Sequence, residues 1–282
     1  MKLVRFGAAG RERPGILDSA GNVRDASVVV ADYAGEGLSR ASLARLAAVD
    51  TATLPKIENA RLGPPVAGVR NFIAVGLNYA DHAAETGAAI PREPILFNKA
   101  PSCIVGPNDD VRIPRDSAKT DWEVELAVVL GEHASYITAD DAKAVVAGFM
   151  VCHDVSERAF QLEHGGQWMK GKGCPTFGPI GPWLVTPDEI PDVRNLSLWL
   201  DVNGERMQAG STRNMVFDVW FLVSYASRFM QLEPGDVITT GTPAGVGMGK
   251  KPPRFLRPGD RVELAVEGLG TQSQRIVGHT ST

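Results

Sequence analysis

The sequence predicts an α+β fold that is mainly β, with a small N-terminal unit followed by a larger strand-rich domain. Short apolar runs with the two-residue period of strands recur from residue 72 to residue 267, and few segments have helical periodicity. Strands and helices do not alternate regularly, which argues against a Rossmann fold or a TIM barrel. The stretch LGPPVAG (62–68), rich in proline and glycine, marks the boundary. We therefore expect domains at 1–68 and 69–282.

The composition argues against some classes of binding partner. The 282 residues are 44% hydrophobic and 22% charged, with a formal net charge of -4 and no extended basic cluster. Nucleic acid and anionic membranes are therefore poor partner candidates, and no apolar run approaches the length of a membrane span. The three cysteines are far apart and form no CxxC motif, which predicts a reduced, cytoplasmic protein.

The N-terminal unit begins with strand-like segments. KLVRF (2–6) is followed by GILDSAGNVRDAS (15–27), where Gly21-Asn22 suits a tight hairpin turn. A helix is predicted over 38–49, because its leucines and alanines fall on one face.

The larger domain is predicted to contain most of the strands and four helices. The glycine-rich stretch GTPAGVGMGK (241–250) is not a phosphate-binding Walker loop, because that motif needs glycine at Ala244 and serine or threonine at Lys251. Strands are predicted at 72–76, 95–99, 124–131, 149–154, 197–204, 236–241 and 262–267, and helices at 79–85, 139–147, 156–163 and 216–228.

Three acids alternate with apolar residues in DWEVEL (121–126). Asp121, Glu123 and Glu125 therefore share one face of a predicted strand. A strand with one solvated face would show the same alternation. The following LAVVL (126–130) is apolar on both faces, however, and predicts that the strand becomes buried. Buried acids need a partner, and a bound cation is one.

Asp154 follows the apolar run GFMVCH and precedes a helix-like segment. It can cap that helix, or it can join Glu123 and Glu125 as a third carboxylate. Three carboxylates form an oxygen-donor site of the kind that Mg²⁺ and Mn²⁺ prefer. The histidines form no HxH or HxxxH pair, so zinc is disfavoured.

Two further groups of residues are candidates for chemistry. His82 and Glu85 lie three residues apart on a predicted helical turn, where they form either a general-base pair or a plain surface contact. Lys170 and Lys172, in WMKGKG, are either surface lysines or a charge that stabilises an enolate or carboxylate beside a metal.

These segments, in this order, resemble the fumarylacetoacetate hydrolase family. The resemblance covers roughly residues 70 to 265 and implies a mixed β-sandwich roll with a small N-terminal domain, usually as a homodimer that binds Mg²⁺ or Mn²⁺. The motifs that carry it are GLNYADHAAE, ILFNKAPSCIVGPNDDVRIP, DWEVELAVVLG, GFMVCHDVSER, WMKGKG and ITTGTPAGVG.

The resemblance also implies roles for individual residues. It makes Glu123, Glu125 and Asp154 the metal ligands, with Asp121 behind them or in solvent. The remaining roles fall on His82 and Glu85 as the water-activating dyad, Lys172 as the lysine near the metal, and Gln161 and Thr242 as substrate ligands.

The reaction that the resemblance implies is metal-dependent hydrolysis of a carbon–carbon bond in a small 2,4-diketo acid, which yields pyruvate and a second acid. The motifs are most similar to those of members that act on 2,4-diketo-3-deoxy sugar acids, such as those from rhamnonate or fuconate, some of which carry the label ureidoglycolate lyase. Two departures bear on the substrate: Leu77 stands where many acylpyruvate-cleaving relatives have arginine, and GCPTFGP (173–179) replaces a commoner SFDTFCP-like sequence.

Alternatives within the family are oxaloacetate decarboxylation or tautomerisation, isomerisation in aromatic-acid breakdown, and ureidoglycolate lyase activity. An alternative of another class is a metal-dependent binding protein without catalysis.

Overall fold

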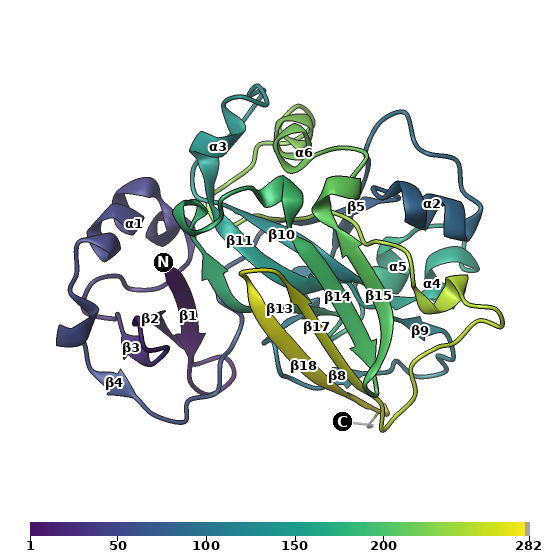
Figure 1. Cartoon of the computed structure of the whole chain (residues 1–282), viewed down its shortest axis with the longest axis horizontal. Helices are drawn as coiled ribbons and strands as arrows, with labels where there is room; N and C mark the ends of the chain where they lie inside the picture. The colour runs from purple at the N-terminus through teal and green to yellow at the C-terminus, as the bar shows by residue number, and fades with distance from the viewer. Residues whose placement is uncertain (280–282) are drawn as a thin grey trace.

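The computed structural model describes residues 1–279. The chain is mostly β-strand, arranged in two open sheets that lie against each other, with short helices at the edges (Figure 1). This agrees with the predicted α+β, mainly β class. The helices are α1 (Arg40–Ala47), α2 (Ala80–Thr86), α3 (Ala142–Val145), α4 (Arg158–Leu162), α5 (Met169–Lys172) and α6 (Val219–Ala226).

The larger sheet has the order β4-β3-β2-β1-β13-β11-β10-β16-β5-β6, with β7 paired to β13. Its strands are β1 (Lys2–Phe6), β2 (Arg13–Leu17), β3 (Val23–Asp25), β4 (Lys56–Ile57), β5 (Phe72–Gly76), β6 (Ile95–Lys99), β7 (Ile104–Val105), β10 (Val124–Leu130), β11 (Val146–His153), β13 (Gly178–Val185) and β16 (Val237–Thr239).

The smaller sheet has the order β15-β14-β17-β18-β8, and a separate two-stranded ladder joins β9 to β12. These strands are β8 (Val111–Arg112), β9 (Thr120–Asp121), β12 (Ser156–Glu157), β14 (Ser197–Val202), β15 (Glu205–Ser211), β17 (Arg261–Val266) and β18 (Gly270–Val277).

The interface between the two sheets contains most of the core and also a few buried amides. Strands β10, β11 and β13 contact β17 and β18 through apolar side chains such as Val151 and Leu264. Gln272 is fully buried between the sheets, and its amide nitrogen donates to the carbonyls of Val151 and Gly181 at 2.9 and 3.0 Å. Such bonds are required there, because a buried amide without partners would destabilise the fold.

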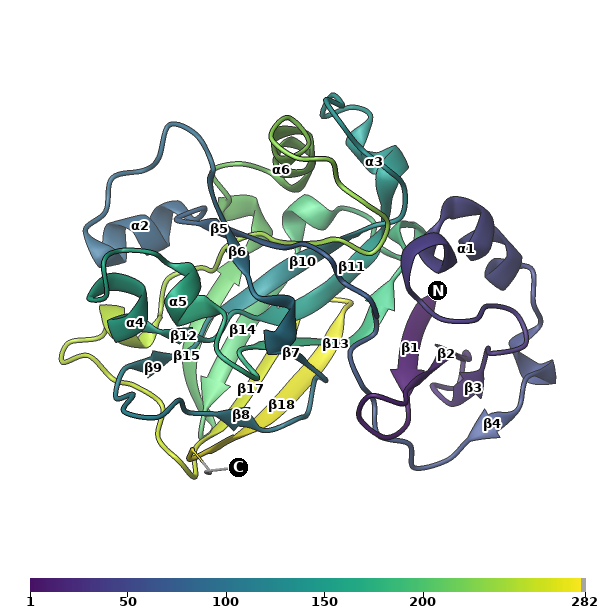
Figure 2. The ribbon, with the colours of Figure 1, turned by 180° about the vertical axis from the view of Figure 1, so that it is seen from behind.

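Three short helices gather at one end of the larger sheet. In both views α2, α4 and α5 lie together at the end of the molecule that is far from the N-terminal strands (Figures 1 and 2). This end is also where β10 begins, so the acids of DWEVEL lie beneath these helices.

Several predicted elements are confirmed and others are wrong. The strands at 72–76 and 95–99 have the predicted bounds, and a turn at Asp18–Asn22 closes the predicted hairpin. The helix predicted over 139–147 is reduced to α3, because β11 begins at Val146 and all its residues are buried. Strand β13 was missed, since its sequence GPIGPWLV contains two prolines.

The N-terminal strands are part of the larger sheet. Lys2 and Leu3 of β1 pair with Val185 and Leu184 of β13. Residues 1–279 contain no helix long and apolar enough to cross a membrane. The boundary at residue 68 remains a prediction.

The pairing of β1 with β13 leads to a testable expectation about that boundary. Removal of residues 1–68 exposes the edge of β13 and the apolar residues that β1 covers, and such an edge promotes association. We expect the fragment 69–282 to elute as aggregates in size-exclusion chromatography, while the full chain elutes as a defined species. A soluble, well-folded fragment would instead establish an independent domain.

Candidate metal centre and active site

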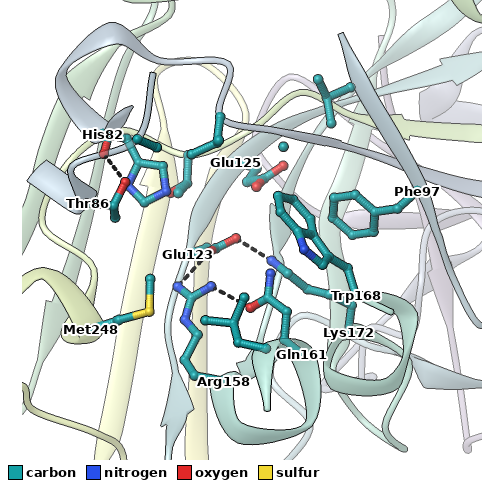
Figure 3. Close-up of a pocket in the computed structure, with 16 residues that line it drawn as sticks. His82, Thr86, Phe97, Glu123, Glu125, Arg158, Gln161, Trp168, Lys172 and Met248 are labelled. Carbon is teal, nitrogen blue, oxygen red and sulfur yellow. Dashed lines mark hydrogen bonds and ion pairs between the residues drawn. The ribbon is translucent and has the colours of Figure 1, made fainter. Parts of the chain in front are cut away.

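A cavity of about 190 Å³ opens where α2, α4 and α5 meet the start of β10 (Figure 3). The ring of Trp168 forms one wall of the cavity and packs directly on Gly76 at the end of β5. Only glycine fits there, since a Cβ at residue 76 would lie 2.3 Å from that ring. The lining residues are Val75, Gly76, Leu77, His82, Thr86, Ala88, Phe97, Glu123, Glu125, Arg158, Gln161, Leu162, Trp168, Lys172, Thr242 and Met248.

Three buried carboxylates converge beside this cavity. Glu123 immediately precedes β10, Glu125 is the second residue of β10, and Asp154 immediately follows β11. The antiparallel pair Val124↔His153 sets these acids side by side. One oxygen from each of the three acids lies within 4.8 Å of the other two. Such a set of hard oxygen donors fits a divalent cation such as Mg²⁺ or Mn²⁺. The three acids can therefore hold a metal ion, as the sequence predicted.

Glu125 is the one acid of the three that forms no ion pair within residues 1–279. Its carboxylate accepts hydrogen bonds from the hydroxyl of Thr239 and from the backbone N–H of Gly241, at 2.8 Å from the latter. Within residues 1–279 no lysine, arginine or histidine pairs with it. Burial, followed by the charges of Asp154 and Glu123, raises the pKa of Glu125 well above its ordinary value. A bound divalent cation would supply the missing positive charge.

Two lysines pair with the other metal-site acids. Lys172 Nζ lies 2.7 Å from both Glu123 Oε2 and Asp154 Oδ2. Lys99 Nζ lies 2.5 Å from Asp154 Oδ1 and donates to the carbonyl of Lys172 at 2.6 Å. Lys172 is thus buried at the acids, and its interpretation as a surface lysine is wrong. Lys170, by contrast, donates to the exposed carbonyl of His164.

Arg158, at the start of α4, connects Asp121 to the metal site. Its Nε lies 2.8 Å from Asp121 Oδ2 and its Nη2 lies 2.7 Å from Glu123 Oε1. Burial alone would raise the pKa of Glu123, but Lys172 and Arg158 hold it below its usual range. Asp121 is fully buried and also accepts from the N–H of Gly247 at 2.6 Å. The interpretation that the acidic face meets water is therefore wrong.

Asp154 does not cap the helix that follows it. The N-cap of α4 is Glu157, whose carboxylate accepts from the N–H of Ala159 at 3.2 Å. Both oxygens of Asp154 instead face Lys99 and Lys172. Helix α4 begins four residues after Asp154, because β12 intervenes and pairs with β9.

His82 and Glu85 form a pair on α2 at the opposite wall of the cavity. His82 Nδ1 lies 3.6 Å from Glu85 Oε2, slightly beyond hydrogen-bond length. Both oxygens of Glu85 accept from the N–H of Gly245, at 2.9 and 3.0 Å. Burial opposes ionisation of Glu85, but His82 and Gly245 lower its pKa. The pair is mostly buried, so it is not a surface contact.

Gln161 and Thr242 also line the cavity, and both already have protein partners. Gln161 Oε1 accepts from Arg158 Nη1 at 3.0 Å. The hydroxyl of Thr242 donates to the carbonyl of Val124, and it accepts from Gln208 Nε2, at 2.8 Å each. Gln208 also accepts from the N–H of Val124 at 2.9 Å. It therefore fixes the peptide between Glu123 and Glu125.

The structure thus brings all eight predicted site residues together, although their catalytic and binding roles remain predictions. Among the unpredicted residues that contact them, three have long polar side chains that bond to the site: Lys99, Arg158 and Gln208. For Lys99 and Arg158 the sequence offered one usable signal, because each is a basic residue close to a predicted strand or carboxylate that it could neutralise. Gln208 offered none, since its partners are 84 and 34 residues away in the chain.

Comparisons with known proteins show which proteins this chain is similar to. Residues 71–277 match the family model described as fumarylacetoacetate (FAA) hydrolase C-terminal. A protein of Burkholderia orbicola (strain MC0-3), provisionally named a hydrolase, is 59% identical over 279 residues, which cover 98% of each chain.

Solved structures resemble the whole chain. A fumarylacetoacetate hydrolase from psychrophilic Exiguobacterium antarcticum has a TM-score of 0.88 at 38% identity, covering 99% of this chain and all of its own. The same coverage applies to a maleylpyruvate hydrolase from Sphingobium sp. SYK-6, solved with manganese(II) and pyruvate, at a TM-score of 0.82 and 27% identity. A 5-carboxymethyl-2-hydroxymuconate delta-isomerase from Mycobacterium smegmatis has a TM-score of 0.79 at 32% identity, with both chains fully covered.

The unbalanced charge of Glu125 predicts opposite effects on stability and on metal binding. Glu125→Gln keeps an oxygen that can accept from Thr239 and Gly241, but it removes a buried charge without a partner. We expect the metal-free variant to melt above the metal-free wild type, and added Mn²⁺ to produce little further rise in Tm. Differential scanning calorimetry with and without Mn²⁺ measures both. A variant that keeps the full Mn²⁺-dependent rise would remove Glu125 from the ligand set.

A second prediction concerns Gln208, with Gln272 as its matched control. Both glutamines are fully buried and bond to backbone carbonyls, but only Gln208 bonds to the peptide between Glu123 and Glu125. We expect Gln208→Leu and Gln272→Leu to lose similar stability, of about 1–3 kcal/mol each. Only Gln208→Leu should weaken Mn²⁺ binding, by about tenfold or more. Equal Mn²⁺ affinities in titration calorimetry would contradict this role.

Proposed function

The chain belongs to the fumarylacetoacetate hydrolase family, and on that premise we propose that it is a metal-dependent hydrolase of 2,4-diketo acids. It would cleave the bond between carbons 3 and 4 and release pyruvate and a second acid. The observation that carries this proposal is the cavity itself, which has a buried carboxylate triad on one wall and a His–Glu pair on the other.

The triad would hold the cofactor, Mg²⁺ or Mn²⁺. A divalent ion bound there would polarise the 2-keto oxygen and favour the enolate that bond cleavage produces. Glu123, Glu125 and Asp154 would bind it, and Lys172 is close enough to share the stabilisation of that enolate charge.

The His–Glu pair would activate water. Glu85 faces Nδ1 of His82, so Nε2 is the atom that would take a proton from water. The water oxygen would attack carbon 4, which becomes the carboxylic acid of the second product. The electron pair of the broken bond would remain on carbon 3, and a proton added there completes the methyl group of pyruvate.

Gln161 is the better placed of the two predicted substrate ligands. Its carboxamide lines the cavity and uses its oxygen for Arg158, which leaves its N–H₂ group for a substrate oxygen. The hydroxyl hydrogen of Thr242 is already donated to Val124. We therefore propose that Thr242 mainly positions the metal-binding strand, and that its direct contact with substrate is secondary.

The substrate proposed from sequence is a 2,4-diketo-3-deoxy sugar acid, processed in the cytoplasm by a homodimer. For a 6-deoxy sugar acid the products would be pyruvate and lactate. Isomerisation is the second candidate, because three similar structures are named isomerases. Decarboxylation needs neither an attacking water nor a general base, so the His82–Glu85 pair favours hydrolysis over decarboxylation.

Replacement of His82 separates water activation from metal binding. We expect His82→Ala to lower kcat by about 100-fold or more, the usual effect of losing a general base, with unchanged Mn²⁺ affinity. Glu85→Gln should have a similar but smaller effect. The assay follows pyruvate release from 2,4-diketo acids in ¹⁸O-water, with label expected in the carboxylate of the second acid.

The same assay discriminates between the candidate reactions. Hydrolysis by His82→Ala at the wild-type rate would show that this histidine does not activate water. An isomer of the substrate, or CO₂ from oxaloacetate, in place of a labelled second acid would identify one of the other family reactions.

A further inference from the structure

The ionised groups around the metal site balance one substrate carboxylate and not two. We propose that this enzyme takes a 2,4-diketo acid whose acyl tail, beyond carbon 4, carries no charge and meets an apolar wall. The inference rests on the proposed function. It would separate this chain from enzymes whose substrates end in a second carboxylate.

The charge balance follows from the contacts. Ion pairs and the shared metal position link four buried carboxylates and three buried cations, which leaves one negative charge. A divalent ion turns this into one positive charge, and the carboxylate on carbon 1 of the substrate neutralises it. The carboxylates are Asp121, Glu123, Glu125 and Asp154, and the cations are Lys99, Arg158 and Lys172.

In the described part of the chain, no lysine or arginine in the cavity wall remains free for a second carboxylate. Lys172 and Arg158 are the only lysine and arginine that line the cavity within residues 1–279, and both already contact Glu123. They also lie at the metal end, where the pyruvoyl half of the substrate belongs. A carboxylate at the other end of the substrate would be buried without a partner, which is strongly unfavourable.

The rest of the cavity wall is apolar. Phe97 and Trp168 meet edge to face at 5.2 Å, and the tail would lie against these rings and against apolar side chains opposite. Thr86 already donates its hydroxyl hydrogen to the carbonyl of His82. The indole N–H of Trp168 forms no hydrogen bond within residues 1–279, so one neutral oxygen on the tail can be recognised. The remaining wall residues are Val75, Leu77, Ala88, Leu162 and Met248.

Leu77 lies in this wall, and a positively charged side chain at its position would change the net charge that the cavity presents to the substrate tail. Its backbone is left-handed, with φ of 53°, and arginine carries the same Cβ as leucine. Leu77→Arg therefore adds a charge to the wall without adding a branched side chain to a constrained backbone. Met169 is 53% exposed and does not line the cavity, so Met169→Arg places the same charge outside it.

The test uses three ligands that differ only at the end of the tail. These are 2,4-dioxoheptanedioate, its 7-amide, and 7-methyl-2,4-dioxooctanoate, which end in a carboxylate, a neutral amide and a branched alkyl group of similar shape. Calorimetry with the Mg²⁺-loaded His82→Ala protein measures binding, and wild-type protein in the same buffer is assayed for pyruvate. We expect both neutral ligands to bind at least about 100-fold more tightly than the dioate.

The charge variants give the matched comparison. In the His82→Ala background, Leu77→Arg should tighten binding of the dioate by about tenfold or more, and Met169→Arg should leave it unchanged. Equal or tighter binding of the dioate by the parent protein, or no binding of any of the three ligands, would overturn the inference. Neutral ligands that bind preferentially but release no pyruvate would support the inference and overturn the proposed hydrolysis.

Discussion

The site depends on the burial of negative charge at the start of β10. Glu123, Glu125 and Asp154 lie so close together that they repel one another, and little water is present to weaken the repulsion. Lys99 and Lys172 neutralise Asp154, and Arg158 with Lys172 neutralises Glu123, but Glu125 keeps only hydrogen-bond donors. The arrangement therefore favours a divalent cation over any further protein side chain.

The second sheet contributes to this site although it carries none of the metal ligands. Gln208 of β15 bonds to the backbone N–H of Val124 and to Thr242, so a residue of the second sheet holds the start of strand β10. Lys99 of β6 acts similarly beneath Asp154, because it also bonds to the carbonyl of Lys172. Residues from both sheets thus restrict the acids and the lysine to one geometry, which is what selective binding of a small ion requires.

The sequence predicted the fold class and five of the eight candidate residues because their signals are local, whereas Lys172, Gln161 and Thr242 were assigned through the resemblance to the family. Alternating acids in DWEVEL, the i,i+3 spacing of His82 and Glu85, and the aspartate after an apolar strand each lie within one short segment. The missed features depend on contacts between distant segments. Nothing near Arg158 indicates that its guanidinium spans Asp121 and Glu123, and nothing near β13 indicates that a strand with two prolines pairs with β1.

On the proposed function, the two ends of the cavity would recognise a substrate by different physical means. At the end with the three carboxylates recognition would be electrostatic, because the buried charges fix how much negative charge can be accommodated there. At the other end, apolar side chains and one free indole N–H offer contact area but little charge compensation. Relatives with the same metal end can thus differ in substrate through a few wall positions. Leu77 is such a position, since its apolar side chain lines the cavity just before α2 and holds none of the three carboxylates in place.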